Sequence, residues 1–444
     1  TPPRTMFTQA LAEKTRRDFL KLSAAGVGVA TSSGWLKVLA DRAATAPKTN
    51  RKVKSVVLLW MDGGPSHKDT FDLKPDSKGA GEFKPVKTSA PGVEICENFE
   101  KLSKLMHHGV IVRSMSTPEG AHPRAKYQLH TGYREGQGGL TYPSLGAMVS
   151  SEVGNHDSAV PNFVSIGGRS YGSGFLGPKH QPLIVTDANK GVEDLKSIVA
   201  EKQFTSRLEL LQEMEKAFHG EYKAGVITDH KTAYDRAVKL MNSKEAKAFD
   251  ISLEPAASRE RYSPADNGGK GKGNGGSRFG DGVLMARRLV EVGVPFVEVS
   301  LGGWDTHTDN FTRVKANSLQ VDAAAGSLIA DLKERGLLDS TLVIWMGEFG
   351  RTPNINTRGD KPGRDHYPKA WSLAMWGGGL KGGQVVGKTD KDGATVEQRK
   401  VTTQDFLATV CELMGIDYTK KNETAGGRPI TLVEKANPFT ADLV

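Results

Sequence analysis

The stretch that decides the fold runs from Thr341 to Trp371 and reads TLVIWMGEFGRTPNINTRGDKPGRDHYPKAW. Its first six residues, 341–346, are apolar and rich in β-branched side chains, which predicts a strand that is buried on both faces of a sheet. Glu348 and Arg351 follow, and a loop rich in Gly, Pro and Asn leads to the pair Asp365–His366. Ligands bind beyond the carboxyl ends of the strands of a parallel α/β sheet. The stretch therefore indicates a metal or anion site, against the alternative of a solvated polar loop.

The composition is that of a globular protein with a large core. Of the 444 residues, 37% are hydrophobic and 25% are charged, so the chain is neither disordered nor embedded in a membrane. The net charge of +9 is diffuse, with no dense basic run that contains aromatic residues, so we expect no binding of nucleic acid. The two cysteines, Cys96 and Cys411, exclude a thiolate zinc site and leave open whether they pair.

The N-terminal region resembles an export signal. Residues 15–21 read TRRDFLK, which fills every position of the twin-arginine consensus, and the apolar stretch 22–30 that follows is too short to span a bilayer. We therefore predict a signal peptide and linker over residues 1–46, the twin-arginine translocation machinery as a partner, and a bacterial periplasmic or cell-surface location with no stable membrane span. The alternative is an ordinary amphipathic helix.

The rest of the chain alternates buried strands with amphipathic helices. We expect strands at 54–60, 110–113, 162–166, 294–300, 341–346 and 372–376. We expect helices at 99–106, 281–292 and 314–335, and one from a Thr402–Asp405 capping box to Gly415. This order predicts an α/β fold, a three-layer sandwich with a largely parallel central sheet, over residues 47–440.

Two segments interrupt this alternation. Apolar residues between 205 and 249 follow helical spacing, which predicts two long helices as a helical insertion at 200–250. Residues 255–280 are rich in Gly, Asn and Lys and predict a flexible loop.

Polar residues that could hold a metal ion follow the predicted strands. Asp305 and His307 come after the strand at 294–300, as Glu348, Asp365 and His366 come after the strand at 341–346. Carboxylate oxygens and imidazole nitrogens are ligands for a divalent ion such as zinc, manganese or iron.

Three further residues are candidates for substrate binding, and a fourth, Asp62, is a candidate metal ligand. Ser66 lies in a GGPS turn that could bind an anion through its backbone amides, and Arg351 and Arg364 could clamp a phosphate or sulfate. Asp62 directly follows the first strand. The alternative for the turn is a tight reversal with capping carboxylates.

Several motifs together resemble the bacterial, commonly exported proteins grouped as domain of unknown function 1501. They are GGPSHKDTFDLKP (63–75), ARRLVEVGVPFVEV (286–299), WDTHTDNF (304–311), TLVIWMGEFGRTP (341–353), GRDHYP (363–368) and GRPI (427–430). The resemblance covers residues 54–432. That family looks like a branch of the alkaline phosphatase and sulfatase superfamily, which implies an alkaline-phosphatase-like fold and hydrolysis of phosphate or sulfate esters at a metal site.

The resemblance also implies roles for single residues. The superfamily nucleophile stands ten positions before the Gly of a T-G pair. Here HPRAKYQLHTG places His122 at that position and Lys126 at the position of the sulfatase arginine. By the same analogy Asp305 is a metal ligand with His307 or Asp309, His366 is the last histidine ligand, and Asp62 is the ligand on the first strand. Glu348 and Phe349 replace an Asp–His pair, so one imidazole is missing unless Asp365 substitutes for it.

The leading expectation is an exported metal-dependent hydrolase of a small-molecule or glycan ester, with zinc, manganese or calcium as the metal. His122 is then a nucleophile, a general acid or base, or another ligand. The alternative is a catalytically silent relative that binds an anionic glycan or a protein partner at the cell surface, which the missing hydroxyl or thiol nucleophile favours. A third possibility is a metal-independent hydrolase that uses Ser66, although GGPSH lacks a GxSxG elbow.

Overall fold

The computed structural model describes residues 52–444, apart from 196, 222–224, 265–278 and 425. The predicted signal peptide and linker at 1–46 therefore lie outside the described residues. Among the residues described, no helix combines the length and the apolar character that crossing a membrane requires.

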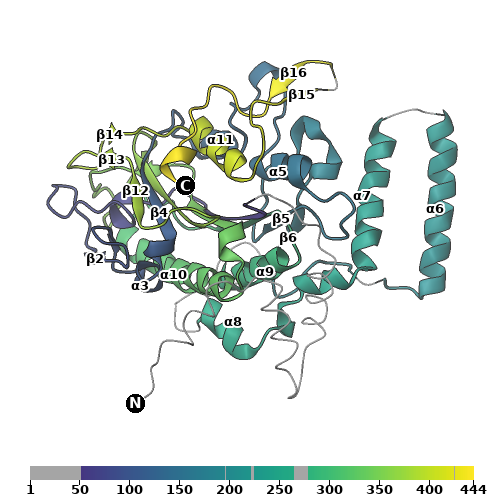
Figure 1. The fold of residues 1–444 in the computed structure, drawn as a ribbon, viewed down its shortest axis with the longest axis horizontal. Helices are drawn as coiled ribbons and strands as arrows, with labels where there is room; N and C mark the ends of the chain where they lie inside the picture. The colour runs from purple at the N-terminus through teal and green to yellow at the C-terminus, as the bar shows by residue number, and fades with distance from the viewer. Residues whose placement is uncertain (1–51, 196, 222–224, 265–278, 425) are drawn as a thin grey trace, which may run out of the picture.

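An eight-stranded sheet forms the centre of the molecule (Figure 1). In spatial order its strands are β12 (Gln384–Val386), β4 (Gly109–Met115), β11 (Trp371–Gly377), β8 (Thr341–Met346), β1 (Ser55–Met61), β7 (Phe296–Leu301), β5 (Phe163–Ile166) and β6 (Leu183–Val185). All neighbouring strands run parallel except β11, which is antiparallel to both β4 and β8. The predicted α/β fold with a largely parallel sheet is confirmed.

Helices cover both faces of the sheet. Side chains alternate along each strand, so every strand can contribute to a core cluster on each face. Val57, Leu59 and Met61 of β1 belong to one core cluster, with apolar residues of α9 (Phe279–Glu291) and α10 (Asn310–Glu334). The intervening residues of β1 belong to a second cluster, with residues of α5 (Leu145–Val153) and α11 (Thr403–Leu413). Figure 1 shows these two helix pairs on opposite sides of the sheet, which makes the three layers of the predicted sandwich.

The central elements match their sequence predictions closely. All residues of β1 and β8 are buried, as their continuous apolar runs predict, and β8 spans the expected residues. The predicted capping box is present at the start of α11, where Thr402 accepts from the backbone of Asp405 and the Asp405 side chain accepts in return. The predicted helix at 99–106 is shorter, with α3 at Glu100–Ser103 only.

The insertion and the small elements lie outside the sheet. Helices α6 (Glu201–Glu221) and α7 (Gly225–Met241) form a hairpin that projects from the body (Figure 1). The first part of the predicted loop at 255–280 is instead helical, because α8 occupies Ala256–Tyr262, where the polar run AASRERY favours a helix over a turn. Residues 265–278 of that predicted loop lie outside the described residues. The remaining short strands are β2 (Pro85–Lys87), β3 (Glu94–Cys96), β9 (Gly350–Arg351), β10 (His366–Tyr367), β13 (Lys388–Thr389), β14 (Val396–Gln398), β15 (Lys421–Glu423) and β16 (Pro429–Thr431).

Candidate metal centre

Three neighbouring strands deliver carboxylates to one edge of the sheet. Strands β8, β1 and β7 lie side by side and in parallel, so their carboxyl ends are level. Asp62 follows β1 directly, Glu348 lies two residues after β8, and Asp305 lies four residues after β7. This edge is where parallel α/β sheets bind their ligands.

The GGPS turn after β1 is packed against these segments. Gly63 has φ +116°, and a Cβ there would lie 2.4 Å from the backbone nitrogen of Asp305, so only glycine fits. The Gly63 amide donates to both carboxylate oxygens of Glu348, at 3.1 and 3.2 Å. The Arg351 guanidinium donates to the Gly63 and Gly64 carbonyls. The turn is thus tied to the protein itself, and its first amide is occupied by Glu348 and not by an external anion.

Two of the histidines reach this edge from separate elements. His122 is the first residue of α4 (His122–Thr131), a helix that has Pro123 in its first turn and ends at Gly132 with φ +80°. His366 lies in β10, which turns back along β9 so that His366 pairs with Arg351. The long polar loop that precedes His366 therefore returns to the point where β8 ended.

Each of three imidazoles is held through its Nδ1 atom by an oxygen atom. The contacts are His122 Nδ1 to Glu348 Oε1 at 2.6 Å, His307 Nδ1 to Asp365 Oδ1 at 2.7 Å, and His366 Nδ1 to the Gly120 carbonyl at 2.8 Å. An oxygen acceptor at Nδ1 keeps the proton on that nitrogen and leaves the lone pair on Nε2. All three rings are therefore oriented as metal ligands usually are.

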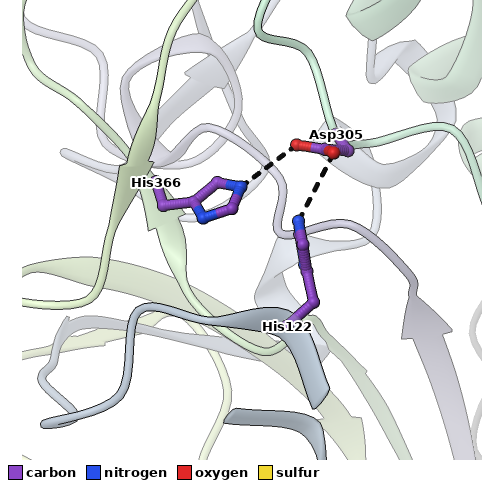
Figure 2. A group of neighbouring side chains, drawn as sticks. All are labelled: His122, Asp305 and His366. Atoms are coloured by element: carbon purple, nitrogen blue, oxygen red, sulfur yellow. Dashed lines mark hydrogen bonds and ion pairs between the residues drawn. The ribbon is translucent and has the colours of Figure 1, made fainter. Parts of the chain in front are cut away.

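The three Nε2 atoms converge on Asp305. They lie 3.4 Å (His122), 3.3 Å (His366) and 3.1 Å (His307) from its carboxylate oxygens. Figure 2 shows the Asp305 carboxylate between the rings of His122 and His366, which approach from different segments of the chain. The Asp305 side chain is 44% exposed, so the cluster opens to solvent on this side.

The pKa values of the cluster residues are shifted in different directions by burial and by neighbouring charges. Burial alone would raise the pKa of Asp305, but the Arg351 guanidinium, 2.6 Å away, outweighs it and lowers that pKa to about 2. The hydrogen bond to Glu348 raises the pKa of His122, whereas burial lowers the pKa of His366. Asp305 is therefore an anion at neutral pH, and it faces imidazoles that differ in basicity.

The residues present fit a divalent metal ion. One nitrogen of His122, one oxygen of Asp305 and one nitrogen of His366 all lie within 4.8 Å of one another. His122 Nε2 is buried and makes no hydrogen bond to the described residues. His307 Nε2 lies only 2.9 Å from His366 Nε2, and two lone pairs at that distance repel unless a proton or a cation lies between them. Two or three imidazoles and a carboxylate are a ligand set for zinc, manganese or iron.

Glu348 and Asp365 stand behind the imidazoles in this arrangement. Glu348 is fully buried, and its oxygens are taken up by His122 and by the Gly63 amide. Asp365 contacts His307 on one side and Arg358 on the other. Both carboxylates orient a histidine, which is the usual role of a carboxylate that contacts the second nitrogen of a ligand.

Helix α4 carries a row of basic side chains along one face. Residues four and eight positions apart in a helix lie on the same side, and three such residues each meet a carboxylate. The pairs are His122 with Glu348, Lys126 with Asp62, and His130 with Glu298. Since the carboxylates come from or after β8, β1 and β7, the helix crosses these three strands in their spatial order. Asp62 is thus paired with Lys126, one helical turn beyond His122.

All three predicted substrate residues, Ser66, Arg351 and Arg364, lie in the protein interior. The side chains of Arg364 and Asp69 are both 0% exposed and form a two-bond pair, at 2.7 and 3.2 Å. The Arg364 guanidinium also donates to the carbonyls of Thr352, Pro353 and Gly79. Ser66 is buried as well. Arg364 therefore holds the loops together, and its donors face protein acceptors.

Three groups at or near the site, His130, Glu298 and the Gly120 carbonyl, were not predicted from sequence. His130 and Glu298 are 5% and 2% exposed, and a signal for His130 existed in the four-residue spacing of His122, Lys126 and His130 along one helix face. The Gly120 carbonyl is a backbone group and leaves no trace in the sequence. Cys96 and Cys411 are both buried and free, so they form no disulfide with each other.

The chain matches the model of one protein family and is similar to several solved structures. A family model described as "Protein of unknown function (DUF1501)" matches residues 53–442. No curated protein matches the chain. The solved structures that the chain resembles include the PsFucS1 sulfatase from Pseudoalteromonas sp., with 17% identity, a TM-score of 0.39, and coverage of 87% of this chain and 72% of that chain.

Two further structures are similar over most of both chains. The C-terminal periplasmic domain of EcEptC from Escherichia coli, in complex with Zn, has 12% identity, a TM-score of 0.37, and coverage of 89% of this chain and 93% of that chain. The alkaline phosphatase from the Antarctic bacterium TAB5 has 10% identity, a TM-score of 0.35, and coverage of 83% of this chain and 99% of that chain.

Proposed function

We propose that this chain, which belongs to the DUF1501 family of proteins of unknown function, is a metal-dependent hydrolase that cleaves a phosphate or sulfate ester at the cluster around Asp305. One observation carries the proposal. Three imidazoles, each held at Nδ1 by an oxygen, direct Nε2 at a single carboxylate. Such anchoring is typical of ligands to a catalytic metal.

His122, Asp305 and His366 would hold the ion, with His307 beside them. A divalent ion there supplies a Lewis acid that polarises the ester. His122 then serves as a ligand and not as a covalent nucleophile, because its Nε2 points to the same carboxylate as that of His366. Water remains as the nucleophile, since this position carries no hydroxyl or thiol.

The protein supplies positive charge on the side from which an anion would approach. Lys126 lies one helical turn after His122, with its side chain 26% exposed, and Arg358 is 73% exposed beside Asp365. Both ammonium and guanidinium groups stabilise the negative charge that develops on a phosphoryl or sulfuryl group. Arg351 acts indirectly, because its buried guanidinium keeps Asp305 ionised.

The test is turnover with a panel of esters. Aryl phosphates, phosphodiesters and aryl sulfates are assayed with the chelator-treated protein, alone and after addition of zinc, manganese or calcium. We expect one ester class to be hydrolysed only with added metal, and the rate to be lost in Asp305→Asn. His107→Ala is the matched control, because His107 is an exposed histidine outside the cluster. Hydrolysis that is equally fast without metal would contradict the proposal.

The residue at position 122 also favours a second candidate function, which is binding without catalysis. His122 stands where the superfamily that this sequence resembles has its nucleophile, and its ring is committed to Glu348. A protein that keeps the metal ligands but has no nucleophile of its own could bind an anionic glycan or a partner without turnover. Metal-dependent binding of an ester analogue such as vanadate or sulfate, with no hydrolysis of any ester in the panel, would identify this case.

Export is part of the proposal. The TRRDFLK motif at 15–21 fits the twin-arginine machinery, which would place the folded protein in the periplasm or at the cell surface. Fusion of residues 1–46 to a reporter that matures only in the cytoplasm tests this. We expect export that is lost when Arg16 and Arg17 are both changed to Lys.

A further inference from the structure

A cavity of about 620 Å³ begins where the metal cluster ends. Asp62 and Lys126 line this cavity, and each of them lies next to a residue that contacts or belongs to the metal cluster. Asp62 precedes Gly63, whose backbone packs against Asp305, and Lys126 lies one turn after His122 on α4. A group bonded to an ester at the cluster can therefore extend into this cavity past the Lys126–Asp62 pair.

Charged groups inside the cavity are paired with each other. Glu298, 2% exposed, lies between His130, at 3.3 Å, and Ser170, which donates to it at 2.5 Å. Lys126 is paired with Asp62. Among the described lining residues, Arg169 at the exposed rim is the charge with no ion pair. The interior offers oxygen acceptors and N–H or O–H donors together, but little net charge.

The walls combine aromatic surface with bare backbone. The rings of Trp60 and Tyr171 flank the His130 ring, with centroids 4.2 and 4.9 Å from it, and both residues line the cavity. Gly168 and Gly302 expose backbone to the cavity, and a Cβ at Gly302 would meet no atom within 4 Å. Apolar ring faces beside mixed donors and acceptors suit a ligand whose own surface alternates C–H and O–H groups.

We propose that this cavity binds the alcohol part of the substrate, and that this part is a neutral, polyhydroxylated ring of the size of one or two sugar units. The proposal rests on the proposed function, in which the ester is cleaved at the cluster. A lipid chain would leave Glu298, Ser170 and His130 facing apolar groups, which is costly for buried polar atoms. A second anionic group inside the cavity would find Lys126 and His130 already paired and would face Glu298 and Asp62, because the unpaired Arg169 lies at the exposed rim.

The test measures sugar binding without metal and without an ester. Chelator-treated protein is titrated with glucose, galactose, mannose, N-acetylglucosamine and their β-1,4-linked disaccharides, and binding is followed by saturation-transfer NMR and calorimetry. We expect at least one of these sugars to bind. The affinity should fall by roughly tenfold in Ser170→Ala, which removes a hydroxyl next to a buried carboxylate. It should fall below detection in Gly302→Leu, which places a side chain in the cavity.

Two control variants match these changes. Ser252→Ala removes an exposed serine hydroxyl elsewhere, and Gly426→Leu adds a side chain at a glycine whose Cβ would meet nothing nearer than 4.0 Å. Both should bind sugar like the parent protein. Thermal melts of all four variants establish that they are folded.

Failure of this inference is distinct from failure of the proposed function. No binding of any sugar by the parent, or equal binding by Gly302→Leu, would overturn the assignment of the cavity even if the protein hydrolyses esters. Sugar binding that Gly302→Leu abolishes, in a protein that turns over no ester with any metal, would support the cavity assignment and remove the hydrolase.

Discussion

The imidazoles of His307 and His366 face each other with their Nε2 atoms 2.9 Å apart, and each ring is held from behind through Nδ1. His366 is held by a backbone carbonyl and His307 by the Asp365 carboxylate, so neither ring can turn away without losing a hydrogen bond. Such a contact between two nitrogens that carry lone pairs is favourable only with a cation or a proton between them.

His366→Ala and His307→Ala should therefore both weaken metal binding, but to different degrees. Loss of a side chain that contacts a ligand costs about 10–100-fold in metal affinity, which is the effect expected for His307→Ala, because His307 lies beside the set formed by His122, Asp305 and His366. His366→Ala should exceed that range, because it removes a nitrogen from the set formed with His122 and Asp305. Competition with a fluorescent zinc chelator measures both. Equal affinities for the two variants and the parent would show that these rings do not bind the ion.

Glu348→Gln should uncouple His122 from the cluster while it preserves the size of the buried side chain. The carboxylate raises the pKa of His122 and fixes its proton on Nδ1, whereas an amide can present either oxygen or nitrogen to the ring. We expect metal affinity to fall by about 10–100-fold. Nitrogen-15 NMR of the imidazole should show that the Nδ1-protonated form is no longer dominant. A tautomer that is unchanged in Glu348→Gln would contradict this role.

Breaking the Arg364–Asp69 pair should damage stability and not metal binding. Both side chains are fully buried, and removal of one partner leaves an unpaired buried charge, at a cost of about 3–5 kcal/mol in the free energy of unfolding. Arg364→Met and Asp69→Asn are compared by urea denaturation, with Arg399→Met as a control because its Asp442 partner lies at the surface. A stable Arg364→Met protein with lost ester binding would instead make Arg364 a substrate residue.

His180 should make the protein less stable at mildly acidic pH. Burial, together with His156 and Lys179, lowers the pKa of His180 to about 4, against about 6.5 in the unfolded chain. Between these two values the unfolded state binds more protons than the folded state, so the free energy of unfolding rises with pH from about 4 to 6.5. His180→Gln should flatten this part of the stability curve, measured by denaturation at several pH values, and a curve of unchanged slope in this variant would contradict the assignment.

The fold was largely predictable because its central elements carry strong local signals. Thr341–Met346 is a continuous β-branched run, and Thr402 with Asp405 forms the expected capping box. Strands β6 and β12 have only three residues each, too few for a pattern, and the reversed direction of β11 follows from long-range pairing with β4 and β8. No local sequence pattern encodes that direction.

The candidate site was predictable in its residue types but not in its connections. Strand ends pointed to Asp305, Glu348 and the Asp365–His366 pair. Glu348 is 226 positions from His122, and only the fold reveals that it supports that ring from behind. The same holds for Asp62, which pairs with Lys126.

The most direct measurement is the metal content of the purified protein, by mass spectrometry of the parent, Asp305→Asn, His366→Ala and the control His107→Ala, after equal incubation with zinc or manganese and removal of free metal. The proposed metal site requires about one or more tightly bound divalent ions per chain in the parent and in His107→Ala, and a loss of bound ion in the other two variants. A parent protein that retains no divalent metal, or one whose metal content is unchanged by Asp305→Asn and His366→Ala, would contradict it.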